Sequence, residues 1–121
     1  MSEIKTHKDL DVWKKSVALV TTVYEITKGF PKEEVYGLTN QIRRSAVSVP
    51  SNIAEGSARQ GNKEYVQFLY VSLGSLTELD TQLIIARNLT YLSEKDFESL
   101  MDIMKEIGKM LIGLIKYVKK K

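Results

Sequence analysis

The sequence contains no cysteine, a single histidine and only two prolines among its 121 residues. Without cysteine the chain cannot form disulfides or thiolate metal sites, and residues 1–11 are polar, without the apolar core of a signal peptide. No apolar run approaches the roughly 20 residues that span a bilayer, because Glu78 and Asp80 interrupt the longest one. We therefore expect a cytoplasmic protein that is not integral to a membrane.

Groups suited to catalysis are also scarce. His7 is the only histidine and lies in a polar segment, and the Glu-x-x-His pairs of di-metal helical bundles are missing. The segment Gly56 to Gly61 lacks the Lys-Ser or Lys-Thr ending of a phosphate-binding loop and is interpreted as a turn. The sequence thus predicts no enzymatic activity, no metal, no cofactor and no small-molecule substrate.

Apolar residues, in contrast, are abundant and recur at alternating steps of three and four, the period of an amphipathic helix. Four such series predict helices at about residues 9–28, 32–58, 62–88 and 93–119. In the first helix the predicted core stripe is Leu10, Trp13, Val17, Val20 and Tyr24. The other three stripes are Val35, Leu38, Ile42, Ala46, Val49 and Ile53; Tyr65, Leu69, Ser72, Leu76, Leu79, Leu83 and Ala86; and Phe97, Leu100, Met104, Ile107, Leu111, Leu114 and Val118.

Helix boundaries are marked by capping and breaking residues. Gly29 and Pro31 end the first helix, Asn62 is a candidate N-cap for the third, and Ser93 with Asp96 forms a capping box for the fourth. Pro50 lies inside the second series and predicts a kink there; a stop and restart of the helix is the alternative. The apolar stripe continues in phase across the proline, which favours the kink.

Four helices joined by short connections predict an all-α, antiparallel up-down-up-down four-helix bundle, formed by one domain over residues 1–121.

A polar stripe runs along the second helix beside its apolar stripe. Small hydroxyl and amide side chains disfavour helix interiors, so a continuous row of them suggests that something contacts this face. A solvated surface, an intramolecular hydrogen-bonded seam and a subunit interface are the alternatives. The candidate interface residues are Gln41, Ser45, Ser48, Asn52 and Glu55.

Basic residues on and after the same helix are candidate phosphate contacts. Arg43 and Arg44 are adjacent on a helix, so their side chains point about 100° apart and face different surroundings. Ion pairing with Glu34, Glu55 or Glu78 is one interpretation of this pair. Nucleic-acid binding is the other, and it would recruit the four residues Arg43, Arg44, Arg59 and Lys63.

Several motifs together resemble a known family. They are Leu10 to Trp13, Phe30-Pro31, Tyr36 to Thr39, the long run from Gln41 to Gly56 with its Arg-Arg and Asn-Ile-Ala-Glu-Gly elements, Gly74-Ser75 and Glu78-Leu79. The sequence resembles the bacterial four-helix-bundle proteins encoded in intervening sequences of 23S rRNA genes. It is also similar to the accessory variability proteins of diversity-generating retroelements, which bind nucleic acid and a partner reverse transcriptase through a positive surface.

The resemblance implies a homopentamer of four-helix protomers. Combined with the arginines, it predicts a non-enzymatic oligomer that binds RNA or DNA weakly, without sequence preference, beside a protein partner. The alternative is a purely structural, scaffolding oligomer that binds no nucleic acid. We expect helices one and two to form the subunit contact, because they carry apolar residues outside the main stripe, namely Val12, Val23, Ile26 and Val47.

Overall fold

The computed structural model describes residues 6–121. It contains the long helices α1 (Asp11–Thr27), α2 (Leu38–Ser57), α3 (Asn62–Asn88) and α4 (Glu94–Lys119), together with the short 3-10 helices η1 (His7–Asp9) and η2 (Lys32–Glu34). No β-strand occurs in the described residues. The prediction of an all-α fold with four helices is therefore confirmed.

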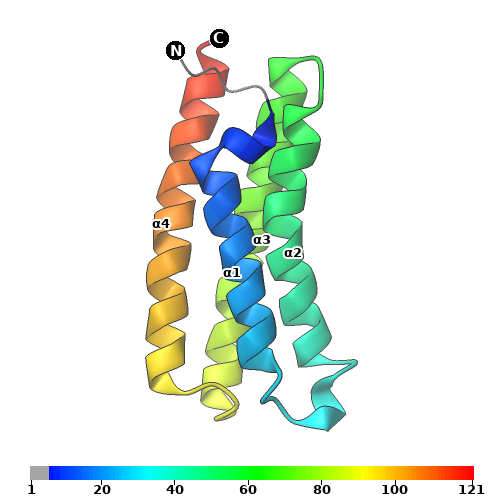
Figure 1. Cartoon of the computed structure of the whole chain (residues 1–121), viewed down its shortest axis with the longest axis vertical. Helices are drawn as coiled ribbons and strands as arrows, with labels where there is room; N and C mark the ends of the chain where they lie inside the picture. Colours follow the sequence, from blue (N-terminus) through cyan, green and yellow to red (C-terminus); the bar gives the residue numbers. More distant parts are fainter. Residues whose placement is uncertain (1–5) are drawn as a thin grey trace.

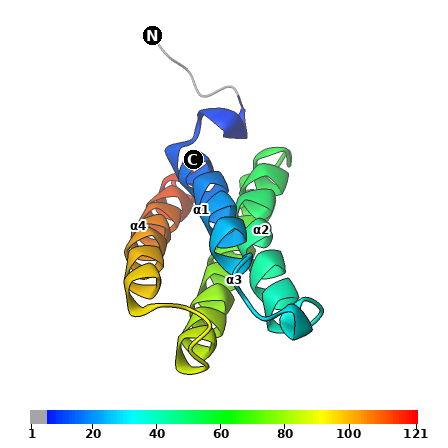
Figure 2. The same ribbon diagram turned by 60° about the horizontal axis from the view of Figure 1, so that its bottom comes forward.

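The helices pack around one apolar core. In Figure 1 the chain descends along α1, rises along α2, descends along α3 at the back and rises along α4. The α2–α3 pair is the most extensively packed, and within residues 6–121 the diagonal pairs make no close backbone approach. Figure 2 turns forward the end that carries the α1–α2 and α3–α4 connections. The largest fully buried side chains come from all four helices: Leu19, Ile42, Ile53, Leu69, Leu79, Leu83, Leu100, Ile107 and Leu111.

None of the helices between residues 6 and 121 combines the length and the apolar composition needed to cross a lipid bilayer.

The buried face of α1 differs in part from the predicted one. Leu10, Trp13 and Val20 are partly buried and pack against the core as predicted, but Val17 and Tyr24 are 37% and 39% exposed. The fully buried residues of this helix are Val12, Ser16, Leu19, Val23 and Thr27. The predicted stripe and the buried residues both have helical spacing, but the buried residues include two polar ones, Ser16 and Thr27. Their hydroxyls donate to the backbone carbonyls four residues earlier, at 2.7 Å each, so they enter the core with their hydrogen bonds made. Val12 and Val23 consequently belong to the core and cannot serve a subunit contact.

The second helix begins six residues later than predicted. Residues Lys32–Glu34 form a separate 3-10 turn, and Gly37 adopts a backbone conformation outside the helical region before α2 starts at Leu38. The Glu34 side chain accepts a 3.2 Å hydrogen bond from the Leu38 amide and so satisfies one free donor of the first turn. Val35, assigned to the core stripe, is exposed as a result.

The rest of α2 follows the predicted pattern. Ile42, Ala46, Val49 and Ile53 are all fully buried. The helix continues through Pro50 without interruption, so the stop-and-restart alternative is wrong, and a bend at this position stays a prediction.

Helices α3 and α4 agree closely with the sequence pattern. The bounds of α3 are those predicted, although its N-cap is Gly61 and Asn62 is already helical, without a side-chain cap. Ser93 caps α4 by accepting a hydrogen bond from the Asp96 amide at 3.1 Å. Towards the end of α4 the buried residue is Ile115, and Leu114, its predicted counterpart, is only partly buried.

Candidate nucleic-acid interface

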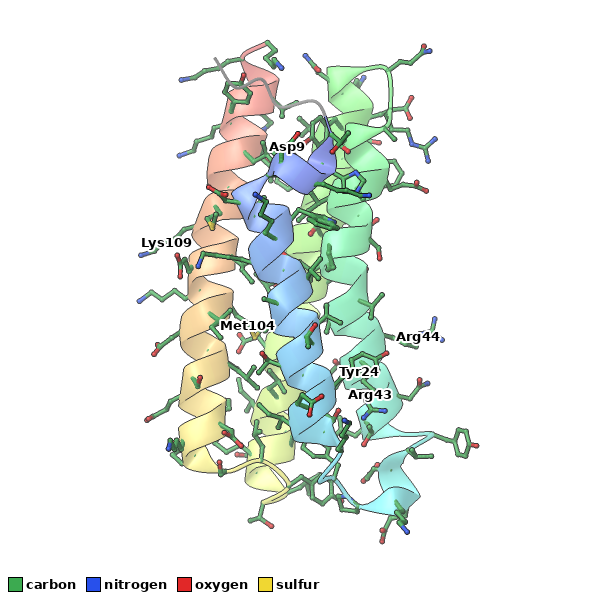
Figure 3. The ribbon with its side chains drawn as sticks, viewed as in Figure 1. Asp9, Tyr24, Arg43, Arg44, Met104 and Lys109 are labelled. Carbon is green, nitrogen blue, oxygen red and sulfur yellow. The ribbon has the colours of Figure 1, made fainter. Side chains whose placement is uncertain are left out.

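Arg43 is held in place by α1. Its Nε donates a 2.9 Å hydrogen bond to Oγ1 of Thr27, and its guanidinium carbon lies 4.6 Å from the centre of the Tyr24 ring. The Thr27 hydroxyl uses its proton on the Val23 carbonyl and therefore has a lone pair for Arg43. Figure 3 shows Tyr24 and Arg43 together near the lower part of α2. Tyr24 was predicted in the core, and its exposed position makes it part of this site.

Arg44 is exposed and borders two shallow hollows on either side of α2. The hollow towards α1 has a volume of about 450 Å³ and includes Tyr24, Asn40 and Val47. The hollow towards α3 has a volume of about 350 Å³ and is mainly polar, lined by Asn40, Gln41, Arg44, Ser45, Ser48, Ser75 and Glu78. In Figure 3 the Arg44 side chain projects away from the bundle. Its guanidinium is thus accessible to a ligand beside neutral hydrogen-bonding groups.

The expected ion pairs of these arginines are not formed. Glu34 accepts a hydrogen bond from the Tyr91 hydroxyl, Glu55 pairs with Arg59, and Glu78 accepts a hydrogen bond from the Gln82 amide. Among the described residues, no carboxylate forms an ion pair with Arg43 or Arg44. Two adjacent positive charges on α2 therefore have no ion-pair partner within residues 6–121.

Arg59 lies in the connection that follows α2, and Lys63 lies in the first turn of α3. Arg59 pairs with Glu55 at 3.6 Å and with Glu64 at 3.9 Å, and its guanidinium lies 4.8 Å from the Phe68 ring centre. From Arg43 to Ser57, the last residue of α2, the helix rises about 21 Å at 1.5 Å per residue, and Arg59 lies beyond that end. The four predicted residues thus form two separate groups, and Arg59 is already neutralised by acids.

The polar stripe of α2 is partly used inside the protomer. The hydroxyls of Ser48 and Ser75 are 2.7 Å apart, and the Asn52 amide donates to both the carbonyl and the hydroxyl of Ser48 at 2.8 Å. Ser45 is buried. The middle of the stripe is therefore an intramolecular seam between α2 and α3, while Gln41 and Glu55 remain exposed.

Close approach of α2 and α3 depends on Gly56. A Cβ atom added there would lie 2.7 Å from Cβ of Phe68 and 3.0 Å from the Tyr65 ring. Small residues on α2 thus serve the packing of these two helices.

An exposed aromatic ring stands on the connection that leads into α2. Tyr36 is 95% exposed, and the neighbouring Gly37 amide donates to the Glu34 carbonyl at 2.9 Å. A Cβ at Gly37 would lie 2.8 Å from Oε1 of Glu34, so glycine allows the carboxylate to occupy this position. The connection is therefore fixed by hydrogen bonds while it presents Tyr36 to solvent.

Within residues 6–121, no three histidine, cysteine, aspartate or glutamate side chains are grouped so that they could hold a metal ion.

The comparisons with known proteins agree with the fold. The family model of the 23S rRNA-intervening sequence protein matches residues 8–113, which include every candidate site residue. The chain belongs to this family. No curated protein matches it. A crystal structure of a protein of unknown function from the S23 ribosomal protein family of Bacteroides thetaiotaomicron is 26% identical, with a TM-score of 0.81, covering 87% of this chain and 95% of that one.

Membership of the 23S rRNA-intervening sequence protein family confirms the resemblance seen in the Gln41 to Gly56 run. That run contains the α2 side of the seam, the small residues that bring α2 against α3, and the two arginines that have no carboxylate partner in the described part of the chain.

Proposed function

We propose that this 23S rRNA-intervening sequence protein is a non-enzymatic, cytoplasmic homo-oligomer, a homopentamer, that binds RNA or DNA weakly and without sequence preference, beside a protein partner. The observation that carries the proposal is the adjacent pair Arg43 and Arg44, which has no carboxylate partner among the described residues. The family name refers to 23S rRNA, which is in keeping with a polyanionic ligand.

Arginine suits this role because its guanidinium binds phosphate oxygens in a bidentate manner. Arg44 can reach a backbone phosphate, and Arg43, stacked on Tyr24, adds positive charge beside it. Contacts of this kind give affinity without sequence readout. Two phosphate contacts per protomer bind weakly, but several protomers on one strand increase the apparent affinity through effective concentration. An oligomer is therefore a natural form for such a binder.

The non-enzymatic part of the proposal is supported by the local chemistry. His7 packs against Trp13 with ring centres 5.1 Å apart. The pKa of Tyr65 is raised by burial, and the pKa of Tyr91 is raised mainly by its hydrogen bond to Glu34. Both shifts move these phenols further from the neutral range in which a general acid or base works.

The alternative is a structural, scaffolding oligomer without nucleic acid. The exposed ends of the α2 stripe, Gln41 and Glu55, favour a protein contact on this helix. Both proposals share self-association and differ only in the ligand of the arginine pair.

The deciding experiment is fluorescence anisotropy with RNA and DNA oligonucleotides of several sequences at about 50 mM salt, followed by a salt titration. The test variant is Arg44→Gln. The matched control is Lys109→Gln on α4, a residue on the other side of the bundle in Figure 3. Both substitutions remove one exposed positive charge.

We expect wild-type affinity to fall steeply with salt, to fall at least about fivefold in Arg44→Gln, and to be nearly unchanged in Lys109→Gln. Equal losses in both variants would mean that only net charge matters. No binding by the wild type would exclude nucleic acid and leave the scaffold.

A further inference from the structure

Tyr36 is the most exposed large apolar side chain of the described residues, at 95%. Single apolar side chains are common on protein surfaces, but Tyr36 is not isolated. Val35 beside it is 47% exposed, and Tyr24 and Val47, which line the hollow between α1 and α2, are each 39% exposed. Exposed apolar side chains thus surround the start of α2, on the part of the helix that carries the arginine pair.

The backbone that carries Tyr36 is fixed by hydrogen bonds. The Gly37 amide donates to the Glu34 carbonyl at 2.9 Å. The Glu34 side chain accepts from the Leu38 amide at 3.2 Å and from the Tyr91 hydroxyl at 3.0 Å. A ring on a fixed backbone loses little conformational freedom on binding, and a tyrosine side chain has only two dihedral angles to immobilise. Tyr36 is therefore preorganised for stacking.

Charge decides which part of a nucleic acid can meet this ring. The connection from Gly29 to Gly37 contains one lysine and two glutamates, so it is slightly acidic and repels phosphate. An uncharged base is not repelled, and every base has a flat face that stacks on an aromatic ring. The phosphates are attracted instead to Arg43 and Arg44, which have no carboxylate partner in the described part of the chain.

The ring and the arginines lie within reach of one strand. The Cα atoms of Tyr36 and Leu38 are at most about 8 Å apart, and Arg44 lies about 9 Å further along the axis of α2. At about 3.4 Å per nucleotide, a stacked strand of about five nucleotides covers this distance. The hollow between α1 and α2 borders Arg44, and its Tyr24 and Val47 side chains offer the strand further apolar contact.

We infer that Tyr36 stacks on an unpaired base, so that the ligand of this site is single-stranded nucleic acid. The inference rests on the proposed function and gives it a substrate class, since two arginines alone would hold the phosphates of a duplex as well. Stacking on a protein ring requires a base with a free face, which a base inside a duplex does not offer. Because all bases stack, the site needs no sequence preference.

The test is fluorescence anisotropy at about 50 mM salt with a labelled RNA of about 12 nucleotides that cannot pair with itself, and with the same strand annealed to its complement. The variants are Tyr36→Ala and Tyr36→Phe, which keeps the ring. The control is Tyr117→Ala, whose side chain is 58% exposed in the last turn of α4. That end of α4 lies opposite the α1–α2 connection in Figure 1. Light scattering and circular dichroism record the mass and helix content of each variant.

We expect the wild type to bind the single strand at least about fivefold more tightly than the duplex. A duplex carries twice the charge per unit length, so charge alone predicts the opposite order. Tyr36→Ala should weaken single-strand binding at least about fivefold and leave duplex binding unchanged, because it removes one stacking platform and no charge. Tyr36→Phe and Tyr117→Ala should keep the wild-type affinity for both RNA forms. Mass and helix content should be the same in all four proteins.

Four outcomes overturn the inference in distinguishable ways. If the wild type binds neither RNA form, the proposed function fails together with the stacking contact. If it binds both forms and Tyr36→Ala changes neither affinity, the arginine site stands and the stacking contact is wrong. Equal losses in Tyr36→Ala and Tyr117→Ala show that the position of the ring does not matter. A lower mass of Tyr36→Ala places Tyr36 in a contact between protein chains.

Discussion

The Tyr91 hydroxyl donates a 3.0 Å hydrogen bond to the Glu34 carboxylate and so joins the α3–α4 connection to the α1–α2 connection. The other carboxylate oxygen accepts from the Leu38 amide at the start of α2, and the Tyr91 ring packs against Phe30 with centres 5.7 Å apart. One acidic side chain thereby fixes the start of the helix that carries both unpaired arginines, and also the segment that presents Tyr36.

This contact predicts an alkaline loss of stability. The hydrogen bond to Glu34, followed by burial and the charges of Glu34 and Glu33, raises the pKa of Tyr91 above its usual 10.0. Because the folded state binds the phenolic proton more tightly, the contribution is complete below about pH 10 and is lost as pH rises through the folded pKa. Urea unfolding should therefore show wild type more stable than Tyr91→Phe at pH 7 to 9, with the difference shrinking above pH 10. A difference that is constant with pH would show that Tyr91 makes no such coupling.

Gly56 predicts a steric effect with a clear control. Alanine there would push its Cβ against Phe68 and against the backbone oxygen of Tyr65, 3.2 Å away. Overpacking of a tight helix contact typically costs about 1–3 kcal/mol, so Gly56→Ala should lower the free energy of unfolding by about that amount. Gly61→Ala, where an added Cβ meets nothing within 4 Å, should change it by less than about 1 kcal/mol. Equal effects of the two substitutions in urea titrations would refute the packing argument.

Much of this fold was predictable because apolar periodicity survives in three of the four helices. On α2 and α3 the large apolar residues and the buried residues largely coincide, so the pattern located the core directly. On α1 two stripes share the same spacing, and the choice by side-chain size was right for Leu10, Trp13 and Val20 but wrong for Val17 and Tyr24. The true core stripe contains Ser16 and Thr27, whose burial depends on hydrogen bonds to their own helix.

The candidate site was less predictable because its geometry is tertiary. Arg43 bonds Thr27 and stacks on Tyr24 because of the way α1 lies beside α2. The periodicity of the sequence does not specify this placement of the two helices. The split between the arginine pair and Arg59, in contrast, follows from helix rise alone and could have been derived from the sequence.

The serine pair across the seam predicts a measurable coupling. Ser48 and Ser75 share a 2.7 Å hydrogen bond, and Asn52 donates to the Ser48 oxygen, which leaves the Ser48 proton for Ser75. A double-mutant cycle with Ser48→Ala and Ser75→Ala should give a coupling of about 0.5–1.5 kcal/mol in the free energy of unfolding. Ser51→Ala, an exposed residue of the same helix, should show no coupling with Ser75→Ala. Additive losses in the Ser48/Ser75 cycle would mean that the seam is only a steric fit.

The two adjacent arginines should respond differently to lysine. Arg43 combines a directed Nε hydrogen bond with stacking on a tyrosine ring, and a lysine ammonium cannot reproduce both. Arg43→Lys should therefore lower the free energy of unfolding by about 1–3 kcal/mol, because a hydrogen bond to a charged group contributes about 1.5–3 kcal/mol and lysine can keep part of the cation–π contact. Arg44 makes no such contact, so Arg44→Lys should leave stability unchanged.

Since lysine keeps the charge but loses bidentate phosphate contact, Arg44→Lys should weaken RNA binding less than Arg44→Gln. Urea titration and anisotropy on the same preparations separate these effects. A destabilised Arg44→Lys together with an unaffected Arg43→Lys would reverse the assignment of the anchoring and the ligand-facing residue.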